Sequence, residues 1–162
     1  MSHDLDELMR GFEDTFGYPP DDNVVTRAEE GAERESIAEL SSMGASSDLL
    51  EFYSEVQEVS LPDVQNGLFI ESATTVVDGA EDGQPTRITG AIEDSVIVIG
   101  SDGGGGLFAL SGSDGKIYLL QGGALIGSTY EVDSGGVEVV ANELSVLLES
   151  FHQKVREALQ DA

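Results

Sequence analysis

The residues VIVIGSDGGGGLFALSGSDGKIYLL, at positions 96–120, decide the fold. They begin with a continuous run of β-branched apolar residues at 96–99, a pattern typical of a strand that is buried on both faces. Two further apolar segments, at 106–110 and 116–120, are joined by the turn-rich sequence SGSDG at 111–115, and this spacing predicts a β-hairpin. We therefore expect an antiparallel sheet at the centre of the molecule.

The sheet is expected to continue downstream of this hairpin. The segments at 124–127, 129–132 and 137–141 are strand candidates, because each is apolar and the turns between them contain Gly or Ser. An amphipathic helix is expected at 142–159, with Asn142 as its N-cap. Its apolar face consists of Leu144, Leu147, Leu148, Phe151, Val155 and Leu159.

Helices are expected upstream of the hairpin. Apolar residues at helical spacing predict one helix at 4–16 and another at about 34–43. A third is predicted to start at Asp48, with Glu51 as its reciprocal capping partner, and to be broken at Pro62. Its apolar face consists of Leu49, Phe52, Tyr53 and Val56.

Three short strands are expected between these helices and the central hairpin, at 68–70, 74–77 and 88–92. The sequence DGAEDGQP at 78–85 is interpreted as a loop between the last two, because it is polar and contains glycine. The expected order is helices, then a run of strands, then one closing helix. This order predicts an α+β fold. Its sheet is expected to be mixed but largely antiparallel, flanked by the N-terminal helices and the C-terminal helix.

The composition fits one folded domain. The chain has 162 residues, of which 40% are hydrophobic, enough for a core without disulfides. We expect an N-terminal helix and acidic linker at 1–33 and a single α+β domain at 34–159. Cysteine is absent, and the N-terminus lacks a basic segment followed by an apolar run. No stretch approaches the roughly 18 apolar residues of a membrane span, so a cytoplasmic location is expected.

The net charge narrows the possible partners. Seven Lys and Arg stand against 32 Asp and Glu, which gives a formal net charge of -25. Such a chain repels nucleic acid and anionic membrane surfaces, because binding to phosphate needs clustered Lys and Arg. A basic protein partner would be attracted by the same field. Acidity that only maintains solubility, or that reflects an acid-biased proteome, explains the charge equally well.

No pattern in the chain predicts a catalytic residue, a cofactor site or a metal site. The Gly-rich sequence at 100–108 lacks the lysine and the following helix of a phosphate-binding loop, so it is interpreted as a strand connection that binds no nucleotide. Loop acids such as Asp102 and Asp114 lack the alternating spacing of calcium ligands. The histidines of the chain are His3 and His152. No Gly-x-Ser-x-Gly motif, the sequence of a nucleophile elbow, occurs around Ser101 or Ser111.

Residues that contact a partner can be suggested only from residue type. Tyr53, flanked by acids, is one anchor candidate, since aromatic residues carry much of the affinity at interfaces, although its helical spacing favours burial in the core. Asp78, Glu81 and Asp82 are expected to form an acidic rim that steers the partner, because loops carry recognition more often than the elements they join. The number of subunits is left open.

Two stretches resemble a known family. Residues 48–70, DLLEFYSEVQEVSLPDVQNGLFI, resemble the helix-then-NG signature of the SUKH superfamily, the killer-toxin-resistance and cell-wall-synthesis-regulator domain. Residues 96–120 resemble its GSDGGG–FAL–DG–VY–L segment. Tyr130 and the sequence at 139–151 fall where that family has a tyrosine and a final helix. The similarity covers about residues 34–151, although this chain lacks the tryptophan found in many members.

The resemblance implies a non-enzymatic α+β domain. Many bacterial members are immunity proteins of polymorphic toxin systems, so the most concrete expectation is an immunity-type inhibitor that covers a basic toxin domain. A regulatory or scaffold protein of the same fold, with an endogenous partner, is the first alternative. A carboxylate-based hydrolase is the second, and a deep pocket with two converging, partly buried carboxylates would favour it.

Overall fold

The computed structural model describes residues 24–160, except 30, 32, 63 and 65–66. The helix expected at 4–16 lies outside the described residues. The elements, in chain order, are β1 (Val24–Arg27), α2 (Arg34–Ser42), α3 (Ser47–Glu55), β2 (Val56–Leu61), β3 (Leu68–Ile70), α4 (Ala73–Glu81), β4 (Arg87–Gly90), β5 (Asp94–Asp102), β6 (Leu107–Ser111), β7 (Ile117–Leu120), β8 (Ala124–Ile126), β9 (Thr129–Val132), the 3₁₀ helix η1 (Ser134–Gly136), β10 (Val137–Ala141) and α5 (Leu144–Gln160).

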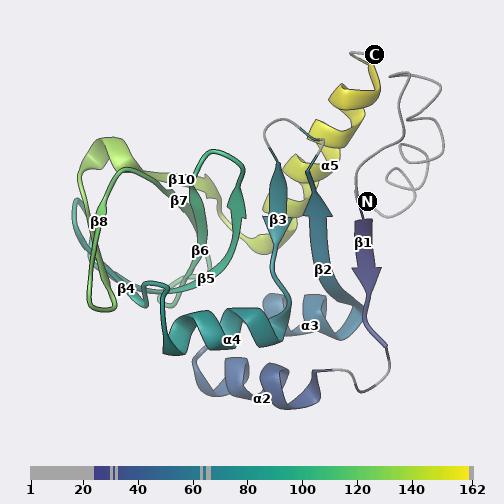
Figure 1. Cartoon of the computed structure of the whole chain (residues 1–162), viewed down its shortest axis with the longest axis horizontal. Coiled ribbons are helices and arrows are strands. Elements are labelled where there is room, and N and C mark those ends of the chain that lie inside the picture. The colour runs from purple at the N-terminus through teal and green to yellow at the C-terminus, as the bar shows by residue number, and fades with distance from the viewer. Residues whose placement is uncertain (1–23, 30, 32, 63, 65–66, 161–162) are drawn as a thin grey trace.

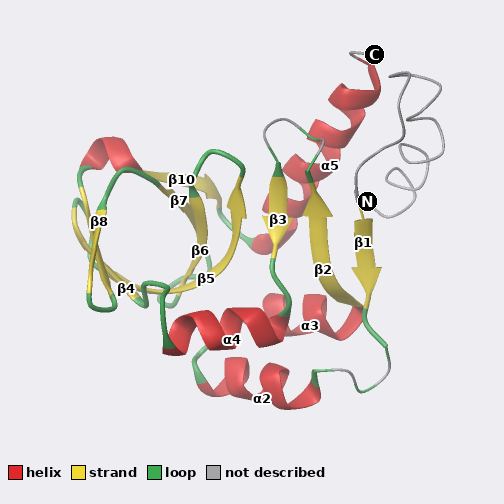
Figure 2. Cartoon of the chain, in the orientation of Figure 1, coloured by secondary structure: helices red, strands yellow, loops and turns green. Residues whose placement is uncertain are grey.

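The fold is α+β, as predicted. The strands form one large sheet in which the pairs are antiparallel, apart from the parallel pair of β4 and β9. Strands β4 to β10 curl into a barrel-like half, while β1 to β3 form a flatter extension beside it (Figure 1). Helices α2, α3 and α4 lie together at one end of the strands, and α5 runs behind β2 and β3 (Figure 2).

Strand β5 is the centre of the sheet, as its apolar run predicts. One of its edges pairs with β3 and β4, and the other pairs with β6. Ile97 and Ile99 belong to the core on the helical side, whereas Val96 and Val98 belong to a second core inside the curled half. Alternation along a strand places successive side chains on opposite faces, so β5 is buried on both.

Helix α5 covers the core on the helical side, as its spacing predicts. Leu144, Leu147, Phe151 and Val155 are buried, and the Phe151 and Phe108 rings lie 5.5 Å apart. Leu148 packs against this core and is half-buried. The helix begins at Leu144, so the predicted start at 142 is two residues early.

The strand predicted at 74–77 is wrong, because these residues belong to helix α4. The hydroxyl of Ser72 caps this helix by accepting a hydrogen bond from the Thr75 amide at 3.3 Å. Ala73, Val76 and Val77 are buried on one helical face, and this packing outweighs the strand propensity of a β-branched sequence. The loop predicted at 78–85 therefore loses its first four residues to the helix.

Both ends of helix α3 and the presence of strand β1 also differ from the prediction. Helix α3 begins at Ser47 and is capped by Ser46, whose hydroxyl accepts the Leu49 amide at 3.3 Å, so Asp48 lies in the first turn instead of at the cap. The helix ends at Glu55, and β2 follows at once because its residues pair with β1 and β3. Strand β1 lies within the expected acidic linker, where Val24-Val25-Thr26 provides β-branched residues for pairing with β2.

Candidate functional site: two acidic pockets beside helix α4

Of the three acids that were predicted as a loop-borne steering rim, two lie in helix α4 and the third directly follows it. Asp78 and Glu81 are exposed in the last turn of the helix, and Asp82 is its C-cap, whose amide donates to the Asp78 carbonyl at 3.0 Å. The helix separates two pockets. Asp78 and Asp82 line one of them, and Glu81 lines the other.

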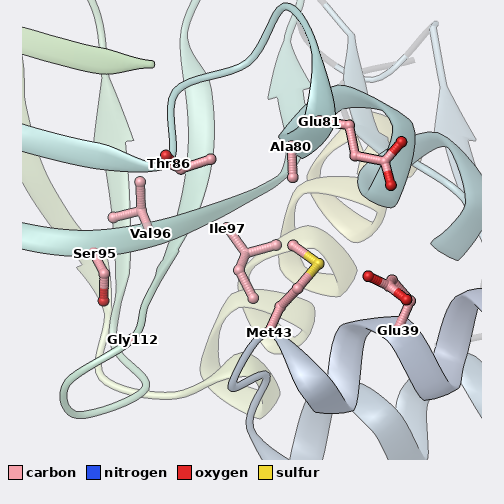
Figure 3. Close-up of a pocket in the computed structure, with 9 residues that line it drawn as sticks. All are labelled: Glu39, Met43, Ala80, Glu81, Thr86, Ser95, Val96, Ile97 and Gly112. Atoms are coloured by element: carbon pink, nitrogen blue, oxygen red, sulfur yellow. The ribbon is translucent and has the colours of Figure 1, made fainter.

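The first pocket, named here the Glu39–Glu81 pocket, has a volume of about 350 Å³. Glu39 comes from α2 and Met43 is the C-cap of that helix, while Ala80 and Glu81 come from α4 and Val96 and Ile97 from β5. Figure 3 shows the carboxylates of Glu39 and Glu81 at the same end of the pocket, with the Met43 side chain between Glu39 and Ile97. The pocket therefore combines an apolar floor with two carboxylates at one end.

The second pocket, named here the Glu71 pocket, has a volume of about 400 Å³ and lies on the other side of α4. Three carboxylates, those of Glu71, Asp78 and Asp82, contribute to its lining. Val98 and Leu107 provide apolar surface from β5 and β6. Each pocket thus places more than one carboxylate beside apolar side chains.

Glu71 differs from the other acids of its pocket in being half-buried. Burial, followed by the negative charge of Glu58, raises the pKa of its carboxyl group. Its backbone is fixed by the core, since its amide donates to the Ile99 carbonyl at 2.8 Å and its carbonyl accepts the Tyr53 hydroxyl at 2.7 Å. The backbone position of Glu71 is therefore fixed, and its side chain lines the same pocket as the exposed Asp78.

No Lys or Arg is among the described residues that line the two pockets. Lys116 is instead paired with Asp114, at 2.8 Å, in the turn between β6 and β7. Across the described ranges, no group of three or more His, Asp or Glu side chains is arranged to hold a metal ion. The five pocket carboxylates are consequently not neutralised by a lysine or arginine in the lining.

Tyr53 is not an exposed anchor. Its side chain is 1% exposed, its hydroxyl donates to the Glu71 carbonyl, and its ring contacts Phe52 edge-on with centroids 5.2 Å apart. Burial is the main cause that raises the pKa of its phenol well above the usual range. The neighbouring aromatic residue on α3, Phe52, lines a shallow groove of about 230 Å³ between α3 and α5. Glu51 and Glu55 line the same groove.

Asp94 forms a polar cluster that the sequence does not reveal. One of its carboxylate oxygens accepts hydrogen bonds from the hydroxyls of Ser111, Ser113 and Tyr118. The Ser111 hydroxyl oxygen also accepts the backbone amides of Ser113 and Asp114, at 3.1 and 3.3 Å. Both the proton and the oxygen of this hydroxyl are thus engaged within the turn. The cluster ties the β6–β7 turn to the start of β5.

Residues 103–106 of the Gly-rich sequence form a compact connection between β5 and β6, as predicted, whereas 100–102 belong to β5 and 107–108 to β6. The Asp102 carboxylate accepts the amides of Gly104 and Gly106 at 2.9 and 2.8 Å. Gly105 has a φ of 87°, which side chains disfavour, and a Cβ on Gly106 would come within 2.9 Å of that carboxylate. The turn itself therefore explains Gly105 and Gly106.

Sequence reasoning identified Asp78, Glu81 and Asp82, but it missed Glu39 and Glu71. The available signal for Glu39 was its position four residues before Met43, the C-cap residue of α2, a spacing that brings two side chains to the same side of a helix. Glu71 lies between β3 and the α4 cap, and no local pattern distinguishes it from other acids.

None of the helices in the described part of the chain is both long enough and apolar enough to cross a membrane. Comparison of the chain with protein-family models, with curated proteins and with solved structures finds no match.

Proposed function

We propose that this chain is a non-enzymatic protein-binding module that binds a basic protein through the two pockets beside α4. The observation that carries the proposal is the set of five carboxylates, with no Lys or Arg, around two apolar-floored pockets. The carboxylates attract a basic surface at long range and suppress the binding of acidic proteins. The apolar floors supply the desolvated contacts that hold a partner after encounter.

The more specific form of the proposal is an immunity-type inhibitor that covers a basic toxin domain. The resemblance of residues 48–70 and 96–120 to a family rich in immunity proteins supports this form. An inhibitor abolishes its partner's activity when it binds, whereas a regulatory or scaffold protein leaves that activity in place. The activity of the captured partner, measured with and without this chain, separates the two roles.

The hydrolase alternative needs two partly buried carboxylates in one pocket. Glu71 is half-buried, but the other carboxylates of its pocket, Asp78 and Asp82, are exposed. Glu39 and Glu81 are both exposed. The pockets beside α4 therefore support protein binding better than carboxylate catalysis, and the absence of enzymatic activity stays a prediction.

Affinity capture with quantitative mass spectrometry tests the proposal. The immobilised chain is compared with the triple variant Asp78→Asn/Glu81→Gln/Asp82→Asn at about 50 mM and about 300 mM NaCl, since added salt shortens the Debye length. We expect the wild type to retain a protein with a net positive charge, and the triple variant to retain several-fold less of that protein. The difference should shrink at the higher salt concentration.

The matched control is Glu138→Gln/Glu149→Gln/Glu157→Gln, which removes the same charge from exposed positions on β10 and α5. It should retain nearly as much partner as the wild type. If the two variants lost equal amounts of retained partner, only total charge would matter, and this would contradict binding at α4. A specific partner with a net negative charge would contradict the proposal altogether.

A further inference from the structure

The Glu39–Glu81 pocket has a shape and chemistry that are more specific than a general acidic surface. Its floor includes Ile97, which is 5% exposed and is fixed in the central strand of the sheet. Met43, the C-cap residue of α2, and Ala80 of α4 add apolar surface. The floor is thus built from three elements that the fold already holds together, so little ordering is needed before a side chain enters.

The two carboxylates of this pocket come from neighbouring helices. Glu39 lies on α2 and Glu81 on α4, and these two helices pack against each other. Both side chains are exposed and lie at one end of the pocket (Figure 3). Within the described part of the chain, neither carboxylate has a hydrogen-bond or ion-pair partner. A cation that enters this end of the pocket would be attracted by both negative charges.

An occupant of this pocket has to be apolar along its length and cationic at its end. A purely apolar side chain would desolvate the two carboxylates without compensating them, and an acidic one would be repelled. Lysine and arginine both pair an aliphatic stem with a charged head. Arginine fits two separate carboxylates better, because its planar guanidinium carries five N–H donors and can bond to both at once, whereas the lysine ammonium acts as a point charge.

We propose that the Glu39–Glu81 pocket receives one arginine side chain of the basic partner. The methylene groups of that side chain pack on Met43 and Ile97, and its guanidinium donates hydrogen bonds to the two carboxylates. This inference rests on the proposed function and adds the anchor that determines specificity for arginine. The pocket volume of about 350 Å³ suits one long side chain rather than a folded element.

Methyl NMR of the full-length chain tests the inference without a known partner. The chain contains three methionines, so selective ¹³C labelling of their ε-methyl groups gives a simple spectrum, in which the Met43→Leu variant assigns Met43. The probes are the N-acetyl amides of arginine, lysine and citrulline, the last being a neutral analogue of arginine. A probe of this size is expected to bind with a Kd of about 1 mM.

We expect the arginine probe to shift the Met43 resonance saturably, the lysine probe to bind several-fold more weakly, and the citrulline probe to have no saturable effect. The Glu39→Gln/Glu81→Gln variant should weaken arginine binding about tenfold, the effect of losing about 1.4 kcal/mol of charge-assisted hydrogen bonding. Both residues are exposed, so the fold should tolerate these changes. No saturable shift with arginine, or an equal shift with citrulline, would overturn the inference.

The variant Asp78→Asn/Asp82→Asn separates this inference from the proposed function, because both residues line the other pocket. It should leave the Met43 response to arginine nearly unchanged while it slows association with the basic partner. If the Met43 resonance of the wild type does not shift with the arginine probe, but this variant still associates more slowly with the basic partner, the arginine pocket alone is refuted. If the Met43 resonance shifts with the arginine probe, but the chain binds no basic partner, the proposed function alone is refuted.

Discussion

At the scale of single residues, Glu71 shows most clearly what the fold imposes on the acidic composition. It is half-buried between the core and the pocket that it lines, and both its burial and the nearby Glu58 raise the pKa of its carboxyl group. The folded state therefore holds a proton at a pH at which the unfolded state has already lost it. Stability should fall as the pH rises from the ordinary pKa of glutamate through the raised one.

The Glu71→Gln variant should consequently unfold at a higher temperature than the wild type at neutral pH. The difference should decrease as the pH falls below the ordinary glutamate pKa, where Glu71 is neutral in both states. Because any lost negative charge relieves repulsion in this chain, the exposed Glu138→Gln serves as the matched control and should give a smaller increase. Thermal melts across pH check this, and a destabilised Glu71→Gln at neutral pH would contradict it.

At the scale of secondary-structure elements, helix α5 is the most direct prediction from sequence. Its apolar residues recur at helical spacing without interruption, and Phe151 lies with 0% exposure beside Phe108. The Phe151→Ala variant should lose roughly 3–5 kcal/mol in its free energy of unfolding, measured by chemical denaturation. On the same helix, Val146 is 44% exposed, so Val146→Ala should change stability by less than about 0.5 kcal/mol. A loss below about 1 kcal/mol for Phe151→Ala would mean that the helix packs only peripherally.

Helix α4 shows why other elements could not be predicted as well. The sequence at 74–77 is β-branched throughout, so local propensity favours a strand. Its helical form depends on the Ser72 cap and on burial of Val76 and Val77 against distant elements, which short-range patterns do not record. The central strand β5, by contrast, was predictable because burial on both faces makes its sequence apolar at every position from 96 to 99.

At the scale of the whole molecule, the acidic character was evident from composition, whereas the pockets were not. The Glu39–Glu81 pocket joins residues from α2, α4 and β5, and these positions lie far apart in the sequence. Their convergence depends on how the helices pack at one end of the sheet (Figure 1). The exposed Asp78 and Asp82 could be suggested as a steering rim, but only the fold places them in one pocket with Glu71.

The net charge of -25 makes the kinetics of association the most informative property of the whole molecule. Charge steers diffusional encounter over roughly 8 Å at physiological ionic strength, so salt should act mainly on the association rate. The dissociation rate depends instead on the desolvated contacts that form after docking, including those with the apolar pocket floors. The two rates therefore report separately on the acidic residues and on the pocket floors.

The association rate with the captured basic partner, measured by stopped flow across a salt series, tests the central claim most directly. The wild-type rate should fall steeply as salt is added. The Asp78→Asn/Asp82→Asn variant, which leaves the Glu39–Glu81 pocket intact, should associate more slowly at low salt and depend less on salt, while its dissociation rate stays nearly unchanged. A wild-type rate that does not respond to salt, or a double variant that associates as fast as the wild type, would contradict binding through the acidic pockets beside α4.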